Sequence, residues 1–272
     1  MAHAVYAAHM HPSLEACGAV LFDLDGVITP TASLHSRAWK ETFDRFLAER
    51  ASATHEPFRE FTETDYIDLV DGKPRIAGVR SFLDSRGIRI PAGTPNDPPG
   101  TRSIHGLAAA KDARFNDLLS SGGIAPYPGS LALLRSLRAN GTKTAVVSSS
   151  RNCSAVLAAA GITDLFDASV DGVEREKLHL RGKPAPDTYL RAAELTGYPP
   201  PRCAVVEDAV AGVEAGRAGG FGLVIGVDRH HHPEELSRHG ADVVVSDLAE
   251  LADGSIDGAT RDDPTSSSPA SS

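Results

Sequence analysis

The chain has 272 residues, and its 27 lysines and arginines against 36 aspartates and glutamates give a formal net charge of −9 at neutral pH. A chain of this length forms one large domain or two smaller ones. The acidic balance leaves no basic surplus with which to bind nucleic acid or an anionic membrane. No apolar run reaches the roughly 18 residues of a membrane span, and the three cysteines lack Cys-x-x-Cys spacing. We therefore expect a cytoplasmic protein without disulfides or a zinc site.

The first predicted element is a buried strand that begins at Ala19 and ends at two carboxylates, Asp23 and Asp25, followed by Gly26. The flanks of a buried parallel strand are apolar, and open α/β sheets bind ligands beyond the carboxyl ends of their strands. Two neighbouring acids are costly to bury without a partner. The pattern indicates a bound cation or a reaction at this edge; the alternative is an acidic surface turn.

The segment after this strand has no strand signals. Residues 31–50 show helical spacing, and shorter helical patterns follow over residues 51–127, interrupted by loop residues at 72–74 and 91–99. From Pro128 onward, helices and strands alternate. We expect strands at 144–147, 165–170, 203–206, 221–227 and 241–245, and helices ending at 140–141 and covering 155–160, 188–196 and 210–217. This alternation predicts a parallel sheet covered on both faces.

The predicted fold class is α/β, with a doubly wound, Rossmann-like parallel sheet and an α-helical cap domain inserted after the first strand. The core is expected to comprise residues 18–31 and 122–252, and the cap residues 32–121. We expect a flexible N-terminus over residues 1–17 and a disordered tail over residues 253–272, which is rich in Ser, Pro, Gly and Asp. His230–His232 resembles a metal cluster, but an exposed loop is the simpler interpretation.

Polar residues follow other predicted strands as well. Ser148–Ser150 and Asn152 follow the second strand, Lys183 lies in a Gly-Lys-Pro loop, and Glu207-Asp208 ends a later strand. Carboxylates together with substrate phosphate suit Mg²⁺, and lysine suits phosphate or an acyl phosphate. For Lys183 taken alone, the alternative is an ordinary surface lysine. For Glu207-Asp208 taken alone, the alternative is a cap of the next helix.

Taken together, these residues resemble the four motifs of the haloacid dehalogenase superfamily, in the expected order and over about residues 18–250. The resemblance implies that Asp23 is a nucleophile that forms an aspartyl-phosphate and that Asp25 is the general acid and base. Ser148 would hydrogen-bond the phosphoryl group, and Lys183 would neutralise its charge. An aspartate at position 25 favours phosphoryl transfer over the dehalogenase and phosphonate-cleaving branches.

The same resemblance implies one Mg²⁺ ion as the cofactor. Its expected ligands are Asp23, Asp25 through its backbone carbonyl, and Asp208, with Glu207 beside them. A carboxylate that approaches a phosphate dianion faces about 4 kcal/mol of repulsion per charge pair at 4 Å, and the cation removes this repulsion.

The predicted cap resembles that of the β-phosphoglucomutase subgroup. The match over residues 31–40 implies that His35 couples Asp25 to cap closure, although a surface histidine is the alternative. The segment 70–75 resembles a loop whose arginine grips a second phosphate, which assigns this role to Arg75. Ser150 and Asn152 would complete that site. Lys111 matches a lysine that faces the sugar; an exposed helix lysine is the alternative.

This subgroup converts β-glucose 1-phosphate to glucose 6-phosphate and is primed by glucose 1,6-bisphosphate. The expected partner is therefore a small phosphorylated sugar. A sugar-phosphate phosphatase, with water as the acceptor, would use the same core residues. A non-catalytic binding protein would be expected to have lost catalytic residues, and none is missing. We expect a monomer, because cap and core supply both walls of the site. Departures at Pro30, at Gly78 and in the 91–101 insertion leave the sugar open.

Overall fold

The computed structural model describes residues 12–55, 57–121, 124–229 and 231–252. A six-stranded parallel sheet in the order β3-β2-β1-β4-β5-β6 lies at its centre. Its strands are β1 (Ala19–Phe22), β2 (Lys143–Val147), β3 (Ala168–Val170), β4 (Cys203–Glu207), β5 (Leu223–Val227) and β6 (Val243–Val245). β1 pairs with β2 on one side and β4 on the other, so the strand order reverses beside β1. The predicted doubly wound sheet is confirmed.

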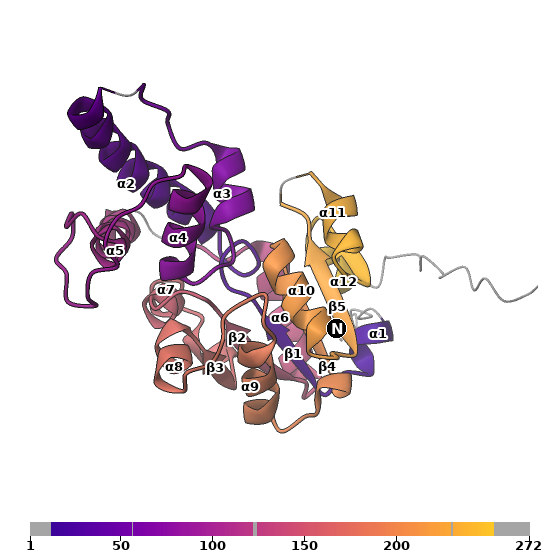
Figure 1. The fold of residues 1–272 in the computed structure, drawn as a ribbon. Helices are drawn as coiled ribbons and strands as arrows, with labels where there is room; N and C mark the ends of the chain where they lie inside the picture. Colours follow the sequence, from indigo (N-terminus) through magenta and orange to yellow (C-terminus); the bar gives the residue numbers. More distant parts are fainter. Residues whose placement is uncertain (1–11, 56, 122–123, 230, 253–272) are drawn as a thin grey trace, which may run out of the picture.

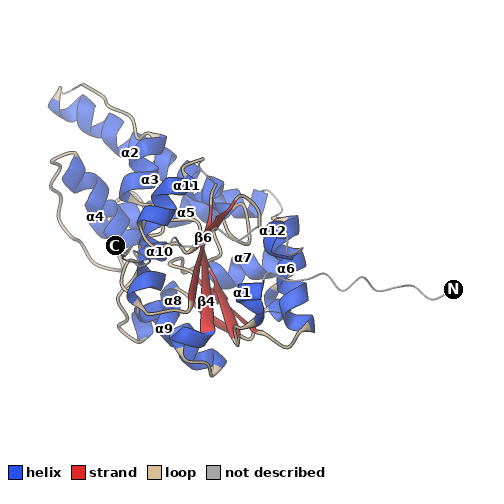
Figure 2. Ribbon diagram, turned by 90° about the vertical axis from the view of Figure 1, so that its right-hand side faces the viewer, coloured by secondary structure: helices blue, strands red, loops and turns tan. Residues whose placement is uncertain are grey.

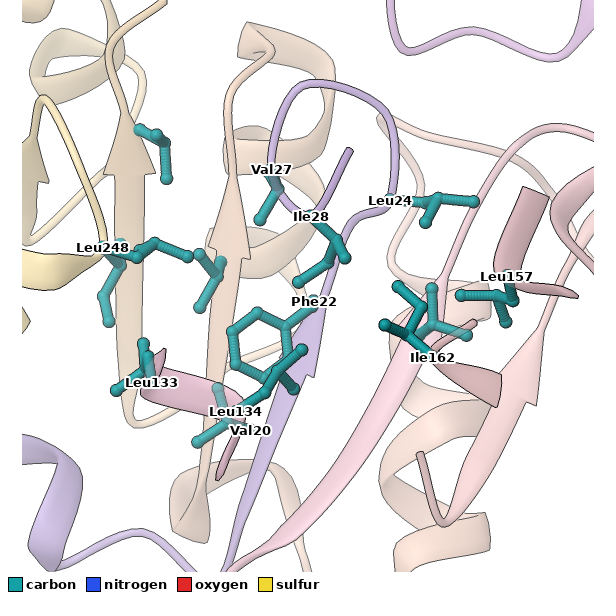
Figure 3. Packing of buried hydrophobic residues seen from close by; sticks show 14 of the residues in the cluster. Val20, Phe22, Leu24, Val27, Ile28, Leu133, Leu134, Leu157, Ile162 and Leu248 are labelled. Carbon is teal, nitrogen blue, oxygen red and sulfur yellow. The ribbon is translucent and has the colours of Figure 1, made fainter. Parts of the chain in front are cut away.

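Helices cover both faces of the sheet (Figure 2). Val20 and Phe22 of β1 point into one layer, which Figure 3 shows close up, and Ala19 and Leu21 point into the other. This alternation is the period of two that a strand imposes on its side chains. The first layer receives side chains from α1 (Pro12–Glu15), α6 (Pro128–Ala139), α7 (Cys153–Ala159) and α12 (Ala249–Ala252), and the second from α9 (Asp187–Thr196), α10 (Val210–Ala218) and α11 (Pro233–Arg238).

The helices between β1 and α6 stand apart from the sheet, at the upper left of Figure 1. They are α2 (Thr31–Thr54), α3 (Glu63–Leu69), α4 (Arg75–Ser85) and α5 (Ile104–Ser121). These helices enclose a hydrophobic cluster of their own, in which the rings of Trp39, Phe61 and Phe82 surround Phe43. The cap thus has a hydrophobic core of its own, while Ala38 of α2 and Phe115 and Leu118 of α5 pack against the core of the sheet domain. Among the described residues, no helix has the length and apolar character needed to cross a membrane.

Several sequence predictions need correction. The strands expected at 221–227 and 241–245 begin at Leu223 and Val243. The strand expected at 165–170 begins only at Ala168, because Leu165 closes a 3₁₀ turn (Thr163–Leu165) and the Asp167 side chain accepts a hydrogen bond from the Thr144 N–H, at 2.9 Å. Part of the N-terminus that was expected to be flexible is packed instead, since Leu14 is fully buried against the sheet.

Other details were not anticipated or lie outside the described residues. The short helices α8 (Gly172–Lys177) and α11 escaped the periodicity analysis, because each spans less than two turns. Residues 1–11, the 253–272 tail and His230 lie outside the described residues, whereas His232 immediately precedes α11.

The cap core provides a stability test. Phe43→Ala should lower the free energy of unfolding by about 3–5 kcal/mol, because it removes a fully buried ring and leaves a cavity. Phe58→Ala makes the same chemical change at a side chain that is 50% exposed and should change stability by less than about 0.5 kcal/mol. Urea unfolding followed by circular dichroism measures both variants, and equal losses would contradict this description of the cap.

Candidate active site

The first acid of the sequence motif is held by the centre of the sheet. Asp23 directly follows β1, and its N–H donates to the Val206 carbonyl of β4 at 2.9 Å. Gly26 then turns the chain with a φ of +88°, in the left-handed region that glycine tolerates. A Cβ at this position would lie 1.8 Å from Oδ2 of Asp208. Glycine is thus required twice, for the turn and for the close approach of the β1 and β4 loops.

A buried lysine joins the ends of β1 and β4. Lys183, which is 3% exposed, donates to Oδ1 of Asp23 and to Oε1 of Glu207, and its Nζ lies 3.3 Å from the Val147 carbonyl of β2. The Tyr189 hydroxyl also donates to Oε1 of Glu207, at 2.9 Å. Each ion in this group has an opposite charge beside it, as a buried charge requires. The lysine therefore orients both carboxylates.

The electrostatics of this cluster fit a divalent cation. Carboxylate oxygens of Asp23, Glu207 and Asp208 lie within 4.8 Å of one another, and all three residues are buried. Burial raises the pKa of Asp23 and of Asp208 well above the usual range, and neighbouring acids add to the effect, while Lys183 opposes it. A hard cation with oxygen ligands would relieve this excess of negative charge.

Glu207 differs from its neighbours in how its oxygens are used. Oε1 accepts from Lys183 and Tyr189, and Oε2 accepts from the backbone N–H groups of Asp208 and Ala209, both at 3.1 Å. These contacts fix Lys183 and the loop before α10. They make Glu207 an organiser of the site in addition to its expected place beside the metal.

The second acid of the motif is held mainly by the cap. Thr31 donates to Oδ1 of Asp25, and Nε2 of His35 lies 3.2 Å from the same oxygen. Lys111 of α5 contacts Nδ1 of His35 from behind. On the core side, the Ser148 hydroxyl donates to Oδ2 of Asp25 at 3.3 Å. A chain of contacts thus runs from α5 through α2 to Asp25, so the cap supplies hydrogen-bonding partners of the Asp25 side chain.

These contacts shift the pKa values of the groups involved. Burial opposes ionisation of Asp25, but the charge and hydrogen bond of His35, together with the Thr31 hydrogen bond, lower its pKa overall. Burial and the nearby Lys111 lower the pKa of His35. Burial and the charge of Arg75 lower the pKa of Lys111 to about 7. These shifts favour Asp25 as an ionised acceptor, with Nε2 of His35 facing it at 3.2 Å.

Cap and core together line a small, partly open cavity. The core contributes Asp23, Asp25, Ser149, Ser150, Glu207, Asp208 and Ala209, and the cap contributes His35, Trp39, Tyr66, Val70, Asp71, Gly72, Lys73, Arg75 and Lys111. The Ser149 hydroxyl donates to the Gly72 carbonyl at 2.8 Å. This hydrogen bond connects the two domains, and the structure therefore represents a closed arrangement.

One group of polar contacts includes Arg75 at the cavity wall. Arg75 and the Asn152 side-chain amide both donate to Oδ1 of Asp112, and the Asn152 contact is 2.9 Å long. Arg75 and Asp112 belong to the cap, whereas Asn152 begins α7 of the core. The Ser150 hydroxyl accepts from the Asn152 N–H at 3.1 Å. Two donors, one from each domain, therefore converge on a single anionic oxygen.

The structure brings the candidate residues of the sequence analysis into one region. Lys183 and Lys111 are both buried beside acids or histidine, so neither is the exposed lysine of the alternative interpretation. Sequence reasoning missed Thr31, Asp112 and Tyr189. Thr31 lies within the matched cap segment and Asp112 directly follows the matched Lys111, so both could have been found there. Tyr189 carries no signal in the sequence, because its partner Glu207 is distant along the chain.

Comparison with known proteins agrees with this geometry. A family model described as haloacid dehalogenase-like hydrolase matches residues 17–220. A β-phosphoglucomutase of Mycobacterium bovis is 51% identical over 237 residues, which cover 86% of this chain and 90% of the relative.

Solved structures with the same fold include other proteins of this kind. A β-phosphoglucomutase from Clostridium difficile superimposes with a TM-score of 0.68 at 26% identity and covers 86% of this chain and 93% of its own. CbbY from Rhodobacter sphaeroides, solved in complex with xylulose 1,5-bisphosphate, superimposes with a TM-score of 0.66 at 27% identity, with coverage of 86% and 96%. The chain is an enzyme that belongs to the haloacid dehalogenase superfamily, in its β-phosphoglucomutase-like subgroup.

Proposed function

We propose that this enzyme is a magnesium-dependent β-phosphoglucomutase that converts β-glucose 1-phosphate to glucose 6-phosphate through the 1,6-bisphosphate. The observation that carries the proposal is the convergence of Arg75 and Asn152 on one carboxylate oxygen of Asp112. A phosphate oxygen that displaces this carboxylate would receive the same two donors. A mutase needs such a second phosphate site, because its bisphosphate intermediate carries one phosphate away from the reacting centre. The M. bovis relative supports this assignment.

In the proposed reaction, Asp23 carries the phosphoryl group as an aspartyl-phosphate. The 6-hydroxyl of β-glucose 1-phosphate attacks its phosphorus, the bond to Asp23 breaks, and Asp25 accepts the hydroxyl proton. The bisphosphate then turns around. Asp23 attacks the phosphorus at C1, the bond between that phosphorus and O1 breaks, and Asp25 returns its proton to O1. Glucose 6-phosphate leaves, and the aspartyl-phosphate is restored for the next cycle.

The other residues support these two steps. Lys183 offsets the charge that Asp23 and the transferred oxygens share, and Ser148 is placed to donate to the phosphoryl group. The proposed Mg²⁺ ligands are Asp23, Asp208 and the backbone carbonyl of Asp25, with Glu207 beside them. When bound, the ion neutralises charge between nucleophile and phosphate.

Closure of the cap excludes water, so that the sugar hydroxyl is the acceptor. One chain supplies both walls of the cavity, which supports a monomer as the working unit.

Phosphorus NMR tests the proposed function directly. Purified protein would be incubated with Mg²⁺, β-glucose 1-phosphate and a trace of glucose 1,6-bisphosphate. We expect a growing glucose 6-phosphate signal without inorganic phosphate. Inorganic phosphate as the sole product would instead identify a sugar-phosphate phosphatase with a mutase-like cap.

The first prediction concerns the nucleophile. Beryllium fluoride with Mg²⁺ should raise the melting temperature by roughly 5 °C, since a ligand at 100 times its Kd stabilises by about 2.7 kcal/mol. EDTA should abolish the shift. Asp23→Asn should also lose it, because the amide cannot coordinate beryllium as a carboxylate does. The control Asp84→Asn changes an exposed acid of α4 and should keep the shift. A shift that persists in Asp23→Asn would exclude this nucleophile.

The second prediction concerns the distal phosphate. Arg75→Met should reduce isomerisation by about a hundredfold, because truncating one partner of a hydrogen-bonded charge pair costs about 2–5 kcal/mol. Hydrolysis of a small aryl phosphate, which has no second phosphate, should change by less than about threefold. Arg80→Met alters an exposed arginine of the same helix and should leave both rates unchanged. Isomerisation that survives in Arg75→Met would refute the phosphate clamp.

The third prediction concerns pH. The folded protein holds Lys111 with a pKa of about 7, and a sugar phosphate, whose second pKa is near 6, is already a dianion above that pH. The substrate charge is then constant, and the protonated lysine is the better hydrogen-bond donor to the sugar, so KM should rise with pH above 7, by up to about tenfold per unit. Lys111→Met should flatten this limb, whereas Lys177→Met, at an exposed position, should retain it. A limb that is unchanged in Lys111→Met would contradict the assignment.

A further inference from the structure

Arg229 lies outside every motif of the sequence, in the loop that follows β5. Its Nε donates to the Gly26 carbonyl at 2.7 Å, and its Nη1 donates to the Ser246 carbonyl at 3.1 Å. The guanidinium carbon also lies 4.0 Å from the centre of the Tyr127 ring. Hydrogen bonds from a charged donor are stronger than neutral ones, and a cation over an aromatic ring adds a further attraction. The arginine is therefore held by three different segments.

Two of these segments are the linkers between cap and core. Gly26 lies on the outgoing linker, between β1 and α2, and Tyr127 lies on the returning linker, just before α6. The linkers are joined to each other by a hydrogen bond from the Tyr127 N–H to the Ile28 carbonyl, at 2.9 Å. Arg229 thus contacts both linkers at the core end, where the cap must pivot if it opens and closes.

The contact between Arg229 and Gly26 restrains the backbone next to Asp25, which is the preceding residue. The Gly26 N–H donates to the Thr29 carbonyl at 2.8 Å, and Asp25 pairs with Thr29 as an isolated bridge. Arg229 holds the opposite side of the Gly26 unit through its carbonyl. Both backbone polar groups of Gly26, the residue after Asp25, are therefore held. The turn holds its N–H, and Arg229 holds its carbonyl.

We propose that Arg229 is a positioning residue, which fixes the core ends of both linkers so that movement of the cap does not displace Asp25 from the reacting atoms. The inference rests on the acid-base role of Asp25 in the proposed function. Arg229 does not line the cavity, so it acts through Gly26 and Tyr127 and has no contact with substrate. A displacement of Asp25 by about 1 Å is enough to slow proton transfer by up to about a hundredfold.

The test compares Arg229→Met, Arg229→Lys and Arg217→Met. Arg217 is a matched control, because it also donates to a carbonyl, that of Gly240, at 2.8 and 3.1 Å, on the side of the core away from the linkers. The readouts are kcat and KM for hydrolysis of para-nitrophenyl phosphate with Mg²⁺, the melting temperature, and its shift with beryllium fluoride. Aryl phosphate hydrolysis needs no second phosphate, so this test is separate from the phosphorus NMR test of the mutase reaction.

Arg229→Met should lower kcat by about ten- to a hundredfold, with KM changed less than twofold. The beryllium fluoride shift should become smaller but persist, because Asp23 and Asp208 keep their places while the Asp25 carbonyl, the third proposed Mg²⁺ ligand, is displaced. Arg229→Lys should recover much of the rate, since an ammonium can donate to Gly26 and lie over Tyr127. Arg217→Met should lower the melting temperature without lowering kcat. The proposal is overturned if kcat is unchanged in Arg229→Met, or if Arg217→Met lowers it equally.

Discussion

A buried lysine between two carboxylates is the constraint on which this site depends. Lys183, Asp23 and Glu207 are 3%, 6% and 1% exposed, and charges so deeply buried are tolerated only when they are paired. Lys183 satisfies this condition for the ends of β1 and β4 at once. With Asp208 nearby, one positive charge faces three acids, and this imbalance is what a divalent cation would correct. The groups that stabilise the sheet edge are thus the same ones that would bind the proposed metal.

Two acids only two residues apart experience opposite environments. Burial raises the pKa of Asp23, whereas contacts from the cap lower the pKa of Asp25. Asp23 belongs to the rigid sheet, and Asp25 takes its partners from Thr31 and His35 of α2. In the proposed mechanism the nucleophile needs a fixed position, while the acid-base group gains from being assembled only when the cap is closed. The division between core and cap partners provides both properties within one short loop.

The cap has a second part in the proposed chemistry. Arg75 reaches toward the core, where Asn152 shares its partner Asp112. This carboxylate satisfies two donors, one from the cap and one from the core, and so connects the two domains. A dianionic phosphate brings more charge than one carboxylate and can replace it. The linkers allow such a cap to move, and Arg229 restricts where they bend.

The sequence by itself determined the sheet, the inserted helices and which polar residues gather at the carboxyl edge of the sheet. Hydrophobic periodicity is local, and polar residues at the ends of parallel strands must meet at one edge. Only the tertiary structure decided the packing of Leu14, the late start of β3 at Ala168, and the contacts of Asp112, Tyr189 and Arg229. Each of these depends on residues distant in the chain: Arg229 and Gly26 are 203 positions apart. Local patterns predict which face of an element is buried, but long-range packing selects the partner that each polar group receives.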